Sequence, residues 1–183
     1  MVKRRHKRAT PARRMIDEAR AILDALELPR EQRNDRSALT LLALLDLKPG
    51  TSWNHVGSPL LGITEMMDHF AKHFRKRYAP NTRETVRRQT IHQFEQMGLV
   101  VANPDDKNRP VNSPDNRYQI AAPLLKLART VGTKGWEREL SAFRKGAQLL
   151  ARLRPQARLM KRIPVRLPDG TALTLTAGGQ NEL

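Results

Sequence analysis

The chain has 183 residues, enough for one sizeable domain or two small ones, and no cysteine, which excludes disulfides and thiolate metal sites. It carries 34 Lys and Arg against 18 Asp and Glu, and the formal net charge of +16 favours binding to polyanions, above all nucleic acid. No apolar run approaches the roughly 18 residues of a membrane span, and no apolar segment follows the basic N-terminus. We therefore expect a cytoplasmic protein without a signal peptide or a membrane partner.

The N-terminal part of the sequence predicts a basic arm followed by two packed helices. Residues 1–14 are rich in Lys and Arg and contain Pro11, which is typical of an arm that stays disordered until it lies along phosphates. A solubilising tail is the alternative. Residues 15–28 have an apolar stripe at helical spacing, and we expect an amphipathic helix that ends before Pro29. Residues 35–47 are leucine-rich all round, which predicts a helix buried at the centre of its domain.

Two further helices are predicted close together, over residues 64–78 and 81–97, with a short break at Ala79-Pro80. Thr64 is the expected N-cap of the first. Asn81 is the expected N-cap of the second, and Glu84 three residues later would complete a capping box. Gly98 supplies the left-handed residue that ends this helix. Two helices joined by a turn, the second carrying contact residues, predict a helix-turn-helix.

The second of these helices has one apolar and one polar face. The apolar stripe consists of Val86, Thr90, Phe94 and Met97, with Ile91 on its flank. Arg and Gln pair with guanine and adenine edges in a major groove, so the opposite face predicts DNA base contacts. These predicted base contacts are Thr85, Arg88, Gln89 and His92. The predicted backbone contacts are Lys76, Arg77, Thr82, Arg83, Lys107 and Arg109. A solvated helix face without a ligand is the alternative.

The rest of the chain mixes short strands with helices. Residues 99–102 and 117–120 read as two strands that flank a polar loop, which predicts a wing, although a plain surface hairpin would have the same composition. Helical patterns begin at Leu124 and over residues 136–153, and residues 163–175 predict a β-hairpin around Pro168-Asp169-Gly170. The expected fold is mainly α with small β elements: a winged helix-turn-helix, C-terminal helices and a terminal β-hairpin. The expected division is a disordered arm (1–14), a DNA-binding domain (15–120), a helical extension (121–160), and a hairpin with the start of a truncated nuclease domain (161–183).

In these features the sequence resembles the N-terminal region of type II restriction endonucleases of the BsuBI/PstI type. The most specific match is the run Arg77-Tyr-Ala-Pro-Asn-Thr-Arg-Glu-Thr-Val-Arg-Arg-Gln-Thr90. Shorter matches are Leu60–Thr64, Met66–Asp68, Arg109–Pro114, Ile163–Val165, Leu167–Gly170 and Gly178–Leu183. The resemblance implies a helix-turn-helix that binds double-stranded DNA, followed by a Mg²⁺-dependent nuclease domain that cuts both strands at a short palindrome. It places the catalytic residues beyond residue 183, so we expect the chain to contain the recognition region of a longer enzyme and to be inactive alone.

Other sites and functions are weaker alternatives. Glu182 is the single candidate for a catalytic acid, and one carboxylate does not hold Mg²⁺, so we expect no cofactor in this chain. His69 and His73 lie one helical turn apart, which can suit zinc, but no third ligand has a matching spacing, and no metal site is expected. A stand-alone winged-helix transcriptional regulator and an RNA-binding protein remain alternative functions. A homodimer is compatible with the palindrome that the resemblance implies.

Overall fold

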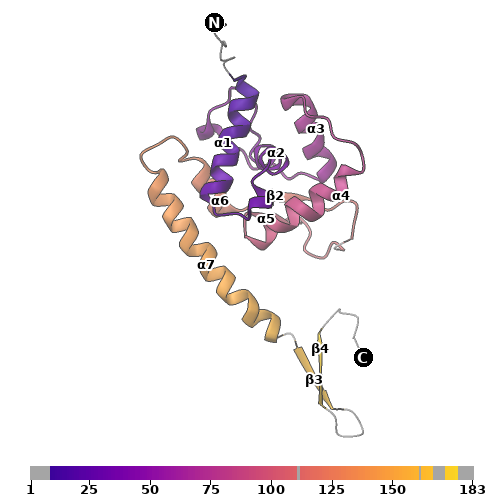
Figure 1. Ribbon diagram of the computed structural model, residues 1–183. Coiled ribbons are helices and arrows are strands. Elements are labelled where there is room, and N and C mark those ends of the chain that lie inside the picture. The colour runs from indigo at the N-terminus through magenta and orange to yellow at the C-terminus, as the bar shows by residue number, and fades with distance from the viewer. Residues whose placement is uncertain (1–8, 111, 161, 167–171, 177–183) are drawn as a thin grey trace, which may run out of the picture. The chain divides into compact units, whose positions relative to one another are not determined.

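The computed structural model describes residues 9–110, 112–160, 162–166 and 172–176. Its contacts divide the chain into two compact units, Met1–Arg144 and Lys145–Leu183. The described residues are mainly helical, with two small antiparallel sheets (Figure 1).

Helices α1, α2 and α3 comprise Pro11–Ala25, Asp35–Leu44 and Ile63–Phe74, and the short helices η1 and η2 comprise Arg30–Gln32 and Trp53–His55. A segmented helix then follows as α4 (Thr82–Val86), η3 (Arg87–Ile91) and α5 (His92–Gln96). Strands β1 (Val100–Ala102) and β2 (Tyr118–Ile120) precede α6 (Ala122–Ala128) and α7 (Trp136–Met160).

Helix α1 begins earlier than its apolar pattern predicts. Its N-cap is Thr10, whose hydroxyl accepts a hydrogen bond from the backbone N–H of Arg13 at 3.2 Å, and Pro11 occupies the first helical position. Proline is well suited to that position because its missing N–H would have no helical partner there. Residues 11–14, predicted to belong to the disordered arm, therefore form the first turn of α1. Residues 1–8 of the predicted arm lie outside the described residues.

Helix α2 is the centre of the first unit, as its leucines predict. Every residue from Ser37 to Leu44 is buried, and α1, α3, the segmented helix and β2 all contact this helix. The Asn34 side chain caps it by accepting a hydrogen bond from the N–H of Ser37 at 3.0 Å. In Figure 1 the neighbouring elements surround α2, so the position of α2 sets where the segmented helix lies.

Helix α3 differs from its prediction at both ends. Its N-cap is Gly62 and not Thr64, and the Glu65 carboxylate accepts a hydrogen bond from the Gly62 N–H at 2.6 Å. The helix ends at Phe74 because Arg75 adopts a left-handed conformation with φ of 56°. The connection to α4 is thus longer than the predicted break at Ala79-Pro80. Tyr78, in this connection, packs edge-on against Phe70 with ring centroids 6.1 Å apart.

The segmented helix spans residues 82–96 and contains one π-helical turn, η3. The N–H of His92 donates to the carbonyl of Arg87, a five-residue spacing that defines this turn. The apolar stripe is confirmed, since Val86, Thr90, Ile91 and Phe94 are fully buried and Met97 packs against the same core. The adjacent Thr90 and Ile91 both lie in the π turn, and both are buried.

The two ends of the segmented helix differ in how well they could be predicted. Gly98 has φ of 72°, and the N–H of Leu99 donates to the Phe94 carbonyl at 2.8 Å, so the predicted glycine stop is confirmed. The predicted capping box of Asn81 and Glu84 is not formed. Asn81 does occupy the N-cap position, but it has helical backbone angles and no side-chain cap bond. The N–H groups of Thr82 and Arg83 donate instead to the carbonyls of Ala79 and Pro80.

The strands β1 and β2 pair antiparallel, with Val100 opposite Ile120, as predicted. Leu61, just before α3, forms an additional antiparallel bridge to Tyr118, with N···O distances of 2.8 and 3.0 Å. This bridge joins the beginning of α3 to the sheet. Beyond β2, Leu124, Leu127 and Leu140 belong to the same buried core. Residues 121–144 are therefore part of the first compact unit.

The second unit contains the end of α7 and a hairpin. Helix α7 continues to Met160, past the predicted end at residue 153. Strands β3 (Arg162–Arg166) and β4 (Ala172–Thr176) pair antiparallel, so the predicted hairpin strands are confirmed. Its turn, Pro168-Asp169-Gly170, and the candidate acid Glu182 lie outside the described residues. Within the described part of the chain, no helix combines the length and apolar character that a membrane crossing requires.

Candidate nucleic-acid interface

The polar face of the segmented helix is open to solvent. Arg88 has a side chain that is 72% exposed, and Gln89 and His92 are also exposed, whereas Thr85 is half-buried. Arg88, Gln89 and His92 therefore lie outside the buried stripe. The face combines a guanidinium, an amide, an imidazole and a hydroxyl, all of which can hydrogen-bond a base edge. DNA contacts by these residues stay a prediction.

Glu84 organises the cationic side chains of this face. Its carboxylate accepts hydrogen bonds from Nε and Nη2 of Arg87 at 2.9 and 2.7 Å, and a further short one from Nε of Arg88. Hydrogen bonding by Arg87, followed by that from Arg88, lowers the pKa of Glu84 to about 2. Glu84 is therefore ionised at any physiological pH and pairs with both arginines in the unbound chain.

Gln89 is in contact with a residue of the central helix. Nη2 of Arg36, in the first turn of α2, donates to Oε1 of Gln89 at 3.2 Å. Nε of the same guanidinium donates to the hydroxyl of buried Thr90 at 3.1 Å. Arg36 thereby connects α2 to one exposed and one buried position of the segmented helix.

His92 and Gln96 form a polar pair at the other end of the face. The ring Nε2 of His92 and Nε2 of Gln96 are 2.9 Å apart. This contact joins the last two polar positions of the exposed face.

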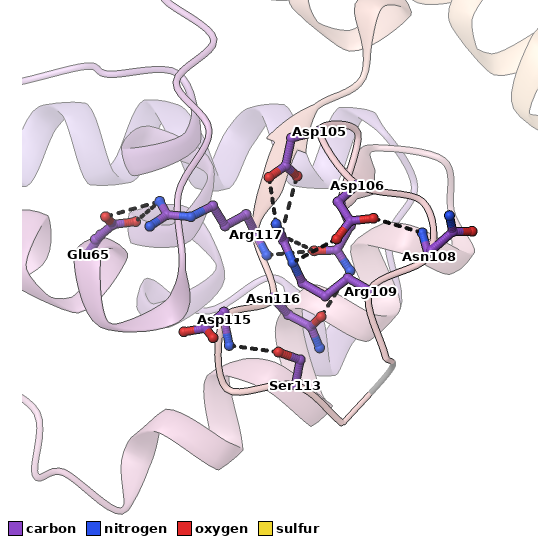
Figure 2. A network of polar contacts seen from close by, with 10 residues as sticks. Glu65, Asp105, Asp106, Asn108, Arg109, Ser113, Asp115, Asn116 and Arg117 are labelled. Atoms are coloured by element: carbon purple, nitrogen blue, oxygen red, sulfur yellow. Dashed lines mark hydrogen bonds and ion pairs between the residues drawn. The ribbon is translucent and has the colours of Figure 1, made fainter.

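The loop between β1 and β2 is held by an internal polar network (Figure 2). Oδ1 of Asn103 accepts hydrogen bonds from Nη1 of Arg109 at 3.0 Å and from the N–H of Arg117 at 2.8 Å. The Arg109 guanidinium also pairs with Asp105 at 2.7 Å, which lowers the pKa of that carboxyl. Arg117 in turn binds Glu65 of α3 at 3.0 Å. The network fixes the loop on the sheet and against α3.

The predicted backbone contacts differ in how available they are. Lys76 and Arg77 are exposed in the connection before α4, and Lys107 is exposed on the β1–β2 loop. Arg109 is different, because its side chain is only 17% exposed and is occupied by Asp105, Asp106 and Asn103. In the unbound chain Arg109 stabilises the loop, and its predicted role as a backbone contact is untested.

The remaining two predicted backbone contacts, Thr82 and Arg83, begin the segmented helix. Nη2 of Arg83 donates to the carbonyl of Pro114 at 2.9 Å, which ties the helix to the β1–β2 loop. A cavity of about 220 Å³ lies beside this contact. It is lined by Ile63, Arg83, Arg87, Asn112, Ser113, Pro114, Asn116 and Tyr118. The helix and the loop thus form adjoining parts of one polar surface.

His69 and His73 lie side by side on α3. Their ring centroids are 4.7 Å apart, and burial lowers the pKa of His69 to about 4, with His73 adding to the shift. Neither ring nitrogen of His69 has a hydrogen-bond partner. Throughout the part of the chain that the structure describes, no three His, Asp or Glu side chains are grouped to hold a metal. The Mg²⁺ that the family resemblance implies therefore has no fitting set of ligands among these residues.

Two residues of this surface were not identified from the sequence. The pairing of Glu84 could have been found, because Arg87 and Arg88 lie three and four residues further along one helix. Arg36 could not, because its partner Gln89 is 53 residues away and no local pattern connects them.

A helix that follows another across a turn, buries one face and exposes cationic and amide side chains on the other defines the class of helix-turn-helix DNA-binding domains. The chain belongs to the family described as BsuBI/PstI restriction endonuclease HTH domain, whose sequence model matches residues 13–152. The predicted resemblance is thereby confirmed.

Individual relatives agree with this membership. The chain is 41% identical over 168 residues to the type II restriction enzyme BsuBI of Bacillus subtilis, an alignment that covers 92% of the chain and 53% of the relative. It is 32% identical over 166 residues to the type II restriction enzyme AplI of Arthrospira platensis, covering 91% and 51%. The solved structure of the SdaI restriction endonuclease matches with a TM-score of 0.71 and 36% identity, covering 90% of the chain and 51% of that structure. The chain thus spans about half the length of each relative.

Proposed function

We propose that this chain is the DNA-recognition region of a type II site-specific restriction endonuclease, and that the segmented helix reads duplex DNA in the major groove. The observation that carries the proposal is the exposed placement of Arg88 and Gln89 on a helix whose other face is part of the core. Arg and Gln are the side chains best suited to bidentate pairing with purine edges. The net charge of +16 supports binding to phosphates.

The β1–β2 hairpin would act as the wing beside this helix. Its position after the segmented helix and the Leu61–Tyr118 bridge to the beginning of α3 support a winged helix-turn-helix. Lys107 is exposed on the loop and would bind a flanking phosphate, together with Lys76, Arg77 and the first turn of the segmented helix.

Cleavage is proposed to depend on residues other than those described. The absence of a metal-binding group among the described residues supports this division, since phosphodiester hydrolysis by such enzymes uses clustered carboxylates and Mg²⁺. We propose that the full enzyme acts in the cytoplasm as a homodimer, because two copies related by a twofold axis match a palindromic site.

The proposal is tested by selecting bound duplexes from a pool with a randomised central segment and sequencing them. The expected result is a short enriched sequence whose strongest positions weaken in Arg88→Ala and Gln89→Ala. Glu137→Gln, an exposed change on α7, serves as the matched control and should leave the enriched sequence unchanged. Recovery of random sequences by the parent chain would contradict the proposed function.

A further inference from the structure

Arg36 occupies an unusual position for a candidate specificity residue, because it lies on the buried central helix and not on the segmented helix. Its guanidinium reaches across to donate to Gln89 Oε1 at 3.2 Å and to Thr90 Oγ1 at 3.1 Å. The backbone of Arg36 is itself fixed, since its carbonyl accepts a hydrogen bond from the Thr40 hydroxyl at 2.9 Å. The side chain is half-buried between the two helices.

The chemistry of this contact determines the orientation of the Gln89 amide. An arginine guanidinium has only N–H donors, so the atom of Gln89 that faces it must be the amide oxygen. The amide nitrogen, with its two N–H donors, is then the atom that points away from Arg36. Gln89 itself is exposed, so these donors are available to a ligand.

A fixed amide differs from a free one in what it can recognise. A freely rotating Gln can pair with adenine, accepting from N6 and donating to N7, and it can also turn its amide donors alone towards guanine. An amide that presents its donors, while its oxygen is engaged by Arg36, matches a base edge that carries acceptors only. Guanine has this edge, because both its N7 and its O6 are acceptors in the major groove.

We propose that Arg36 is a positioning residue that holds the Gln89 amide with its donors outward, and that it thereby biases the base read by Gln89 towards guanine over adenine. This inference rests on the proposed function, since it assumes that the segmented helix lies in the major groove. It adds a residue outside that helix to the determinants of sequence preference.

The test compares base frequencies selected by the parent chain and by variants from the same randomised duplex pool. Gln89→Ala identifies the position that Gln89 reads, because the preference there should be lost. The parent should favour guanine over adenine at that position by roughly tenfold or more. Arg36→Met should reduce this ratio to within about threefold, with the other positions unchanged, because the released amide can pair with either purine.

Two further variants separate orientation from charge and from folding. Arg36→Lys keeps the charge but lacks the planar fork, so it should bind random DNA as the parent does and still lose part of the guanine preference. Gln89→Glu keeps the contact with Arg36 but offers an acceptor only, so the preference at that position should move to cytosine, whose N4 donates. This second variant reports on the contact even where Arg36→Met fails to fold. Arg129→Met, which changes an exposed arginine directly after α6, is the matched control for charge.

The outcomes distinguish this inference from the proposed function. A parent without any base preference contradicts the proposed function and the inference together. A parent preference that Gln89→Ala weakens at one position, while Arg36→Met keeps the parent's guanine-to-adenine ratio there, overturns the role of Arg36 and leaves the proposed function intact. If Arg36→Met loses base preference equally at every position, the role of Arg36 in orienting Gln89 is likewise overturned, because a residue that only maintains the fold would give that result.

Discussion

The carboxylate of Glu84 holds the side chain of Arg88, four residues further along the same helix, through a hydrogen bond to Nε. The Arg88 side chain is 72% exposed, and its partner is an anion on the surface proposed to meet DNA. A nucleic acid that binds Arg88 must therefore either replace Glu84 or accommodate its charge.

Removing this anion should strengthen non-specific binding. Glu84→Gln is expected to raise the affinity for random duplex by a few-fold, roughly two- to fivefold at low salt, because a negative charge near phosphates is lost and both arginines are released. Fluorescence anisotropy with a labelled random duplex measures the effect. Glu137→Gln makes the same change of charge on exposed α7, and an equal gain there would show that position does not matter.

The proposed base contacts should contribute to discrimination. Arg88→Ala and Gln89→Ala are each expected to cost about 1–3 kcal/mol at the preferred sequence and little on random duplex, because a base contact is lost. Lys76→Ala should weaken binding to both duplexes alike, as loss of a phosphate contact does. Competition titrations with the two duplexes separate these patterns. Parent-like discrimination by both helix variants would show that this face does not read bases.

The salt dependence of binding should be steep. The logarithm of the binding constant is expected to fall linearly with the logarithm of the salt concentration, with a slope of about 0.9 per phosphate neutralised. Lys76→Ala should reduce the magnitude of this slope by about 1. Titrations at four or more salt concentrations give the slope, and a flat response in the parent chain would remove the electrostatic basis of the proposed binding.

Substitutions of Arg109 and Lys107 should have different effects, the first on the stability of the β1–β2 loop and the second on DNA binding. Arg109→Ala is expected to speed amide hydrogen exchange over residues 103–117, because Asn103, Asp105 and Asp106 lose their shared partner. Lys107→Ala should leave exchange unchanged and weaken DNA binding uniformly, since its side chain is exposed. Unchanged exchange in Arg109→Ala would argue against the stabilising role of the loop network.

Stability should depend on pH through His69. Burial lowers its pKa to about 4, below the ordinary value of about 6.5 in the unfolded chain, so the unfolded state binds more protons between these values. The contribution of neutral His69 to the free energy of unfolding is complete above pH 6.5, and it is lost as the pH falls from 6.5 towards 4. The charged groups around it do not reverse the sign, because Lys48 and Lys72 lower the pKa further while Asp46 opposes them.

Urea unfolding at pH 7.5 and pH 5 measures this dependence. The parent should be less stable at pH 5, and His69→Phe, which keeps an aromatic ring beside Phe74, should show a smaller difference between the two values. His55→Gln, an exposed histidine, should behave as the parent does. The same difference in the parent and in His69→Phe would show that another group is responsible.

Much of the fold could be predicted from local patterns. The leucines of α2, the stripe of Val86 and Phe94 and the stop at Gly98 each depend on residues within a few turns of one another. Helix ends were less predictable, because a cap competes with other partners. The Thr82 and Arg83 N–H groups bind the Ala79 and Pro80 carbonyls, so Asn81 is not needed as a cap, and Glu84 has two arginines within reach.

The composition of the candidate site was less predictable than the helix that carries it. Helical spacing identified which side chains face outward, but it could not show which of them are already engaged. Arg109 was predicted to contact the DNA backbone, and in the structure its side chain is 17% exposed and pairs with Asp105. The Arg36–Gln89 contact depends on how two helices pack, and packing of that kind has no signature in a single sequence.

The hydrogen bond from Arg83 to the Pro114 carbonyl fixes the distance between the two parts of the surface proposed to bind DNA. The segmented helix is joined to the β1–β2 loop by this bond, and the loop is joined to α3 by Arg117 and Glu65. Three successive elements of the chain would therefore meet the double helix as one body. If the proposed binding mode holds, the spacing between the groove contacts and the outer phosphate contacts would be set by these bonds within the chain.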